Sequence, residues 1–185
     1  MLDLKEVNNN WTLFLDRDGV INYEKKDDYI LNPNEFHFYE EVPESVKIFS
    51  EIFMMNIIAT NQRGVGKGWM TEKDLEAIHE YMQQALEQAG GRIDRIYYCT
   101  SLNDDDPFRK PKPGMALQAK MDFPKIDFSK AIMIGNNISD MEFGRNAGMH
   151  TVFLTTTHPD IQLPHPVIDL VFSNLSAFAK ALQQK

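Results

Sequence analysis

The sequence is poor in cysteine, in positive charge and in long apolar runs, and each shortage excludes classes of protein. Cys99 is the single cysteine among 185 residues, so no disulfide can form within the chain, as is usual in a reducing compartment. The formal net charge of −8 argues against a nucleic-acid partner, whose phosphates are bound by clustered Lys and Arg. No segment approaches the ~20 apolar residues that span a bilayer, and the amino terminus lacks the apolar run of a signal peptide. We therefore expect a cytoplasmic protein without a membrane segment.

Short apolar runs alternate with amphipathic segments, which is the pattern of a parallel sheet covered by helices. The expected strands are residues 11–15, 56–59, 93–98, 131–134, 151–154 and 169–172. The expected helices are residues 43–54, 72–89, 115–121, 140–147 and a last one from about 174, with Thr71 and Ser139 as N-caps of the second and fourth. The predicted fold is α/β, a three-layer α/β/α sandwich with a mainly parallel, Rossmann-like sheet. We expect one domain over residues 1–185 and a monomer, since no long exposed apolar helix is predicted.

Polar residues gather where the predicted strands end. In an open parallel sheet the ligand crevice lies at the carboxyl ends of the strands. Residues far apart in the sequence are therefore expected to meet there, namely Asp16, Asp18, Thr60, Asn61, Asn136 and Asp140.

Asp16 and Asp18 follow the first predicted strand in the stretch LFLDRDGV. Two carboxylates at the mouth of a buried strand are costly unless a cation or hydrogen bonds balance them. Mg²⁺ suits this role, because it prefers a few carboxylates together with substrate phosphate and water. One carboxylate can then attack phosphorus, and the other can serve as general acid and base. A solvated turn with two acids is the alternative interpretation.

Two further segments carry groups that suit a phosphoryl ligand. Thr60, after the second strand, can stabilise the charge of the phosphoryl oxygens, and the glycine-rich residues 63–68 form either a ligand loop or a flexible surface loop. Lys110, in the run RKPKPG, can neutralise both a nucleophile and a phosphoryl group. Arg109 can fork onto a second anionic group of the substrate. The alternative for this run is a solvated basic patch.

Asn136 and Asp140 lie four residues apart after the fourth predicted strand. Asn136 can offer a neutral oxygen to a metal, and Asp140 can orient the site or bind the metal itself. The alternative is a plain capped helix start.

Together these segments resemble the haloacid dehalogenase (HAD) superfamily, over nearly the whole chain. The phrases that carry the likeness are FLDRDGVIN, ATNQRGVGKG, RKPKPGM and GNNISDMEFGRNAG. Within the superfamily they are similar to the group of histidinol-phosphate phosphatase and D,D-heptose 1,7-bisphosphate phosphatase. The resemblance implies a Mg²⁺-dependent phosphatase with a minimal cap, acting on a small phosphorylated metabolite through an aspartyl-phosphate intermediate.

The resemblance also implies a role for each matching residue. Asp16 would be the nucleophile and Asp18 the acid and base, with Thr60 and Lys110 stabilising the phosphoryl group. The metal ligands would come from Asp16, Asp18, Asn136 and Asp140. The substrate would be recognised by Asn61, Gln62, Arg63, Arg109 and, in the loop of residues 24–29, Tyr29.

The chain departs from the group's pattern at two places. Members commonly carry a zinc loop with one His and three Cys before RKPKPG, but here Cys99 stands alone, so we expect no structural zinc. The group usually has Asp where this chain has Asn136, which removes one negative charge from the magnesium site. This change motivates an alternative function, a catalytically impaired relative that binds a phosphorylated ligand or partner. A polynucleotide 3′-phosphatase is a further alternative, disfavoured by the negative net charge.

Overall fold

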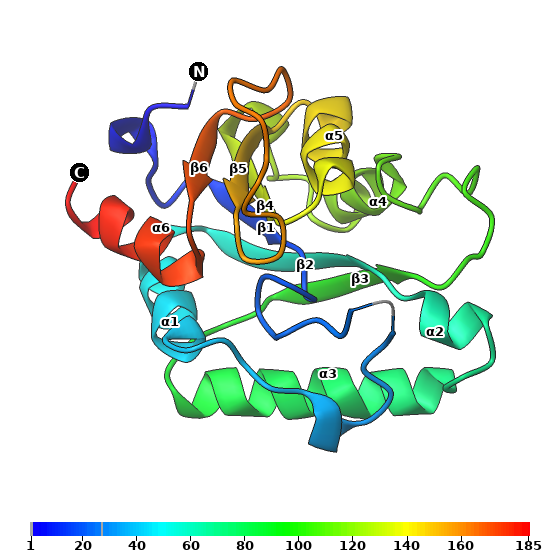
Figure 1. Ribbon diagram of the computed structural model, residues 1–185. Coiled ribbons are helices and arrows are strands. Elements are labelled where there is room, and N and C mark those ends of the chain that lie inside the picture. The colour runs from blue at the N-terminus through cyan, green and yellow to red at the C-terminus, as the bar shows by residue number, and fades with distance from the viewer. Residues whose placement is uncertain (1, 27) are drawn as a thin grey trace.

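The computed structural model describes residues 2–26 and 28–185, and these build one six-stranded sheet in which every strand is parallel to its neighbours (Figure 1). The strand order is β3-β2-β1-β4-β5-β6. The strands are β1 (Thr12–Leu15), β2 (Met55–Asn61), β3 (Arg95–Cys99), β4 (Ala131–Gly135), β5 (His150–Leu154) and β6 (Leu170–Phe172). The α-helices are α1 (Val42–Ile52), α2 (Arg63–Gly66), α3 (Glu72–Gln88), α4 (Gly114–Asp122), α5 (Ile138–Ala147) and α6 (Leu175–Gln183). Short 3-10 helices are η1 (Leu4–Glu6), η2 (Pro33–Glu35) and η3 (Phe128–Lys130).

Helices cover both faces of this sheet, which confirms the predicted three-layer α/β/α sandwich. Helices α1, α3 and α6 share one apolar core, and α4 and α5 line the other (Figure 1). Strand β1 shows why: Leu13 and Leu15 belong to the first core, Phe14 belongs to the second, and all three are fully buried. A central parallel strand is covered on both sides, so it is apolar along its whole length. None of the described helices is both long and apolar enough to cross a membrane.

Of the two helix N-caps predicted from the sequence, one is confirmed and the other is wrong. Thr71 caps α3 as predicted, with its N–H donating to Asp74 Oδ2 over 2.8 Å. Ser139 as the cap of α5 was wrong: Asn137 is the N-cap, and its N–H donates to Asp140 Oδ2 over 3.0 Å. Asp140 lies three residues after Asn137, as a capping box requires, and this spacing in the sequence would have identified the correct N-cap.

The glycine-rich segment after β2 is also more ordered than the loop interpretation implied. Residues Arg63–Gly66 form the short helix α2, closed by a hydrogen bond from the Lys67 N–H to the Arg63 carbonyl over 2.9 Å. The glycines there allow close packing: a Cβ on Gly66 would lie 2.1 Å from the Thr100 carbonyl oxygen.

The sheet topology reverses direction at β1, and this fixes the position of the site. β1 lies between β2 and β4, with Leu15 in register with Ile58 on one side and Ile134 on the other. The chain therefore leaves the ends of these strands in opposite directions and opens a crevice at their carboxyl edge. Asp16, at the end of β1, lies at that point.

The connection between β1 and α1 is the small cap over this edge. Isolated bridges join Asn22 to Asp18 and to Phe38, and the Tyr23 N–H donates to the His37 carbonyl over 2.9 Å. In Figure 1 this segment is drawn in blue, and η2 packs against α3. Asp27, in the predicted substrate loop of residues 24–29, lies outside the described residues.

Candidate active site

Asp16 lies at the centre of the site, at the end of β1. Its N–H donates to the Ile134 carbonyl on β4 over 2.9 Å, and the residue is 8% exposed. Lys110 Nζ lies 2.9 Å from Asp16 Oδ1 and 2.7 Å from Asp140 Oδ1. One buried ammonium thus bridges two buried carboxylates from opposite sides of the sheet's switch point.

This arrangement controls the charge of both partners. Burial raises the pKa of Asp16 to about 7. The charge of Lys110 acts against this rise, and the carboxylates of Asp140 and Asp18 add to it. Burial alone would lower the pKa of Lys110, but Asp140 and Asp16 raise it above its ordinary value, so the ammonium stays charged. Two carboxylates sharing one ammonium leave an excess of negative charge at Asp16 that a second cation can balance.

Asn61 holds Lys110 in this position. Its side-chain Oδ1 accepts from the Lys110 N–H over 3.1 Å, and its Nδ2 donates to the Lys110 carbonyl over 3.2 Å. The side-chain amide of Asn61 thereby pairs with the backbone N–H and carbonyl of a residue 49 positions later, as a neighbouring strand would. Asn61 also lines the cavity in front of Asp16, so its side chain both fixes Lys110 and borders this cavity.

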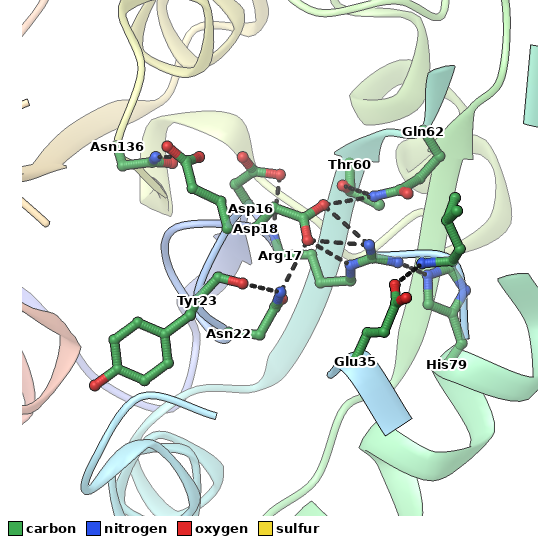
Figure 2. Close-up of polar contacts among 12 residues, drawn as sticks. Asp16, Arg17, Asp18, Asn22, Tyr23, Glu35, Thr60, Gln62, His79 and Asn136 are labelled. Atoms are coloured by element: carbon green, nitrogen blue, oxygen red, sulfur yellow. Dashed lines mark hydrogen bonds and ion pairs between the residues drawn. The ribbon is translucent and has the colours of Figure 1, made fainter. Parts of the chain in front are cut away.

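Asp18 is turned toward a buried arginine that sequence reasoning missed. Arg17 Nη2 donates to both Asp18 oxygens over 3.0 Å, and Arg17 itself is fully buried (Figure 2). Asn22 Nδ2 and Gln62 Nε2 donate to the same carboxylate over 2.9 and 2.8 Å. Burial works against ionisation here, but Arg17 and the two amides prevail and lower the pKa of Asp18 below its ordinary 3.8.

His79 on α3 completes the surroundings of Arg17. Its Nε2 lies 3.2 Å from Arg17 Nη1 (Figure 2). Burial and the charge of Arg17 lower the pKa of His79 to about 3, so the neutral ring accepts a hydrogen bond from the guanidinium. The sequence held one signal for this role, a polar residue next to Ile78 on the apolar face of the predicted helix.

Thr60 and Gln62 stand on either side of Asn61, both buried. Gln62 Nε2 donates to Thr60 Oγ1 over 2.9 Å as well as to Asp18. Thr60 lines the cavity, whereas Gln62 is not among its lining residues. The structure thus gives Gln62, which we predicted to bind substrate, a position behind Asp18, where it orients the carboxylate.

The cavity opens at the carboxyl edge of the sheet, in front of Asp16. Tyr29, predicted to bind substrate, lies on its wall. The lining residues come from the ends of β1, β2 and β4, from the cap and from the Lys110 segment: Asp16, Asp18, Glu24, Lys25, Asp28, Tyr29, Ile30, Thr60, Asn61, Lys110, Asn137, Ser139 and Asp140.

Arg63 and Arg109 meet outside that lining. Both guanidinium groups contact the same carboxylate, that of Asp104, with Arg109 Nε 3.1 Å from Asp104 Oδ1. Lys112 pairs in the same way with Asp105 over 3.0 Å. The acidic loop before RKPKPG thus pairs with the basic residues around it while the Asp104 and Asp105 side chains stay exposed to solvent, and Cys99 is buried in β3.

Asn136 follows β4 and is fully buried. Its Nδ2 donates to Thr157 Oγ1 over 2.7 Å and to Glu24 Oε2 over 3.3 Å, while its Oδ1 has no hydrogen-bond partner among the described residues. Figure 2 shows Asn136 on the opposite side of the Asp16 and Asp18 carboxylates from Arg17. Gly19, with a φ of +80°, allows this packing, since a Cβ there would lie 2.1 Å from Asn136 Nδ2.

The oxygen donors around Asp16 fit a hard cation such as Mg²⁺, although no ready-made cluster of ligands is present. Among residues 2–26 and 28–185, no three Asp, Glu, His or Cys side chains converge as a metal group. The reason is that Asp140 is turned to Lys110, and Asp18 to Arg17. What favours a cation is the buried Oδ1 of Asn136, which has no partner among the described residues and follows β4, the strand paired with the end of β1.

Comparison with known proteins agrees with this geometry. A family model described as HAD-hydrolase-like matches residues 107–177. The D-glycero-alpha-D-manno-heptose-1,7-bisphosphate 7-phosphatase of Campylobacter jejuni is 40% identical over 142 residues, which is 77% of this chain and 80% of that protein. The chain belongs to this HAD-like phosphatase family. The predicted superfamily and the predicted phosphoric monoester hydrolase class are thereby confirmed.

Other members of the family are similar over most of their length. The D-glycero-beta-D-manno-heptose-1,7-bisphosphate 7-phosphatase of Helicobacter pylori strain J99 is 35% identical over 86% of this chain and 90% of its own. The crystal structure of D,D-heptose 1,7-bisphosphate phosphatase from B. bronchiseptica, complexed with magnesium and phosphate, superposes with a TM-score of 0.84 at 27% identity. That superposition covers 94% of this chain and 98% of the other.

Proposed function

We propose that this protein is a Mg²⁺-dependent phosphatase that removes one phosphate from a heptose bisphosphate or a closely similar small phosphate ester. The observation that carries the proposal is the buried triad of Asp16, Lys110 and Asp140, with Lys110 Nζ within 2.9 Å of the Asp16 carboxylate. Relatives named as heptose bisphosphate phosphatases, and one solved with magnesium and phosphate, support the substrate and the cofactor.

Asp16 is the proposed nucleophile. Its Oδ1 takes the contacts with Lys110 and with the Arg17 N–H, over 2.9 and 2.8 Å, which leaves Oδ2 as the attacking atom. Oδ2 forms a bond to phosphorus while the bond from phosphorus to the sugar oxygen breaks. Lys110 and Thr60 stabilise the negative charge on the phosphoryl oxygens. Water then attacks the aspartyl phosphate and releases inorganic phosphate and the free carboxylate.

Asp18 is the proposed acid and base. In the first step its carboxyl group gives a proton to the leaving sugar oxygen, and in the second its carboxylate takes a proton from the attacking water. The present contacts with Arg17, Asn22 and Gln62 hold it as a carboxylate, the form that the second step needs. Proton donation requires the side chain, which is 26% exposed, to turn from Arg17 into the cavity that it lines.

The cation has oxygen ligands available from Asp16, from the Asp18 backbone carbonyl and from Asn136 Oδ1. Bound there, Mg²⁺ would neutralise charge on the phosphoryl group and lower the cost of ionising Asp16. That Asp140 binds the metal directly stays a prediction; its contacts support a role in positioning Lys110. Arg63, Arg109 and Tyr29 are the proposed contacts to the rest of the substrate, with the Asp104 carboxylate displaced by a second phosphate.

The test is Mg²⁺-dependent phosphate release from a panel that includes heptose 1,7-bisphosphate and histidinol phosphate. We expect turnover by the wild-type protein and at least a thousandfold loss in Asp16→Asn, because the nucleophile is removed. Retained turnover in Asp16→Asn would refute the covalent mechanism.

One observation favours a second function, the neutral side chain of Asn136 at the metal site. If wild type releases no phosphate from the panel but Asn136→Asp does, the natural protein is an impaired phosphatase. Its function would then be to bind a phosphorylated ligand, and inorganic phosphate binding by the wild-type protein would be the next measurement.

A further inference from the structure

The carboxylates described so far leave the proposed metal site with a single excess negative charge. Asp18 is neutralised by Arg17, with Nη2 3.0 Å from Oδ2, and Asp16 and Asp140 share the single ammonium of Lys110. Asn136 adds an oxygen without a charge. Mg²⁺ is usually held by one or two carboxylates together with waters and substrate phosphate, so a further carboxylate without a protein cation would strengthen the site.

Glu24 supplies a carboxylate from the cap at this place. Its Oε2 lies 3.3 Å from Asn136 Nδ2, across 112 residues of sequence, and Glu24 lines the same cavity as Asp16. Glu24 forms no ion pair with any described Lys, Arg or His, because the adjacent Lys25 is paired with Glu35 over 2.7 Å. Its negative charge is therefore available to a cation.

The contact with Glu24 also decides which way the amide of Asn136 points. A carboxylate can only accept hydrogen bonds, so the group that faces Glu24 must be the NH₂ of Asn136. Thr157 Oγ1, 2.7 Å from the same nitrogen, holds it there. The Asn136 Oδ1 then has no hydrogen-bond partner among the described residues, as is expected of an atom that can bind a metal.

We infer that Glu24 and Asn136 act as a pair, in which Glu24 provides the negative charge for Mg²⁺ and Asn136 provides a neutral oxygen and positions Glu24. The inference rests on the proposed function, since it concerns the same cation. It also accounts for the amide at position 136: Asn136→Asp would place two carboxylates about as close as the present 3.3 Å contact, where they repel.

Calorimetric titration of the metal-free protein with MgCl₂ tests this pair without using turnover. The proteins are wild type, Glu24→Gln, Asn136→Asp and the double variant. Asp28→Asn is the matched control, because it removes the same charge from the same loop and cavity while Asp28 faces Lys25 over 3.8 Å. We expect Glu24→Gln to weaken Mg²⁺ binding at least tenfold. Asp28→Asn should change it less than threefold, and Asn136→Asp should restore binding in the Glu24→Gln background.

The other outcomes overturn the inference in distinguishable ways. If Glu24→Gln binds Mg²⁺ as wild type does, or if Asp28→Asn is equally weakened, Glu24 has no special role, while the proposed phosphatase stands because the wild-type protein binds the cation. If neither wild type nor Asn136→Asp binds Mg²⁺, the inference and the proposed cofactor fall together.

Discussion

Asp18→Asn should destabilise the fold, although neutralising an active-site acid often does the opposite. Arg17 is fully buried, and the carboxylate of Asp18 is its sole counter-charge among the described residues, with Nη2 3.0 Å from both oxygens. In the variant the guanidinium keeps its charge in the protein interior. One of the amide donors from Asn22 and Gln62 also loses its acceptor.

The magnitude follows from the burial of the pair. Breaking a fully buried ion pair from one side costs about 3–5 kcal/mol. The Asp18 side chain is 26% exposed, so water reaches one end and reduces the cost to about 2–3 kcal/mol. For a chain of this length that corresponds to a fall in Tm of about 4–12 °C.

The assay is urea unfolding followed by circular dichroism at pH 7.5 in EDTA, with the exposed-loop variant Asp28→Asn as control. The pKa of Asp18 is lowered in the folded protein, so its stabilising contribution is present above the ordinary value of 3.8 and is lost as the pH falls below it. The difference between wild type and Asp18→Asn should therefore shrink below about pH 4. An Asp18→Asn variant as stable as wild type at pH 7.5 would refute the reasoning.

Three further substitutions test other parts of the account. Asp16→Asn should stabilise the metal-free protein at pH 8 by up to about 4 kcal/mol, because ionising Asp16, whose pKa is raised in the folded protein, costs the wild type stability as the pH rises from 3.8 to about 7. A stability difference between the variant and wild type that is as large in thermal melts at pH 5 as at pH 8 would contradict this. Gly19→Ala should lower the free energy of unfolding by at least about 2 kcal/mol and abolish phosphate release, since the new Cβ would overlap Asn136 at a φ of +80°; a fully active variant would show that this contact is not needed. Thr71→Ala should cost about 1 kcal/mol in urea unfolding through loss of the α3 cap, with unchanged phosphate release; a drop in activity alone would contradict a purely structural role.

Much of the fold could be predicted from the sequence, because it depends on local patterns. Apolar runs such as residues 131–134 have few alternatives to a buried strand, and β4 covers them. The predicted alternation of strands and helices requires parallel pairing, and parallel pairing brings the strand ends to one edge. Placing Asp16, Thr60 and Asn136 near one another needed no knowledge of side-chain contacts, only the order of the elements.

The tertiary structure decided which of these polar groups face one another, and it did so through contacts that no local pattern encodes. Arg17 stands between two acids in the sequence, and the local pattern does not show that its side chain is buried against Asp18 and His79. The distances between Asn136 and Glu24, and between Lys110 and its two carboxylates, depend on how loops from separate strands pack at the sheet edge. The sequence by itself determined that this edge would carry the chemistry. The direction of each side chain there was decided only by packing, because a buried charge is costly without a partner. That partner is the next residue for Arg17 and Asp18, and comes from separate loops for Lys110.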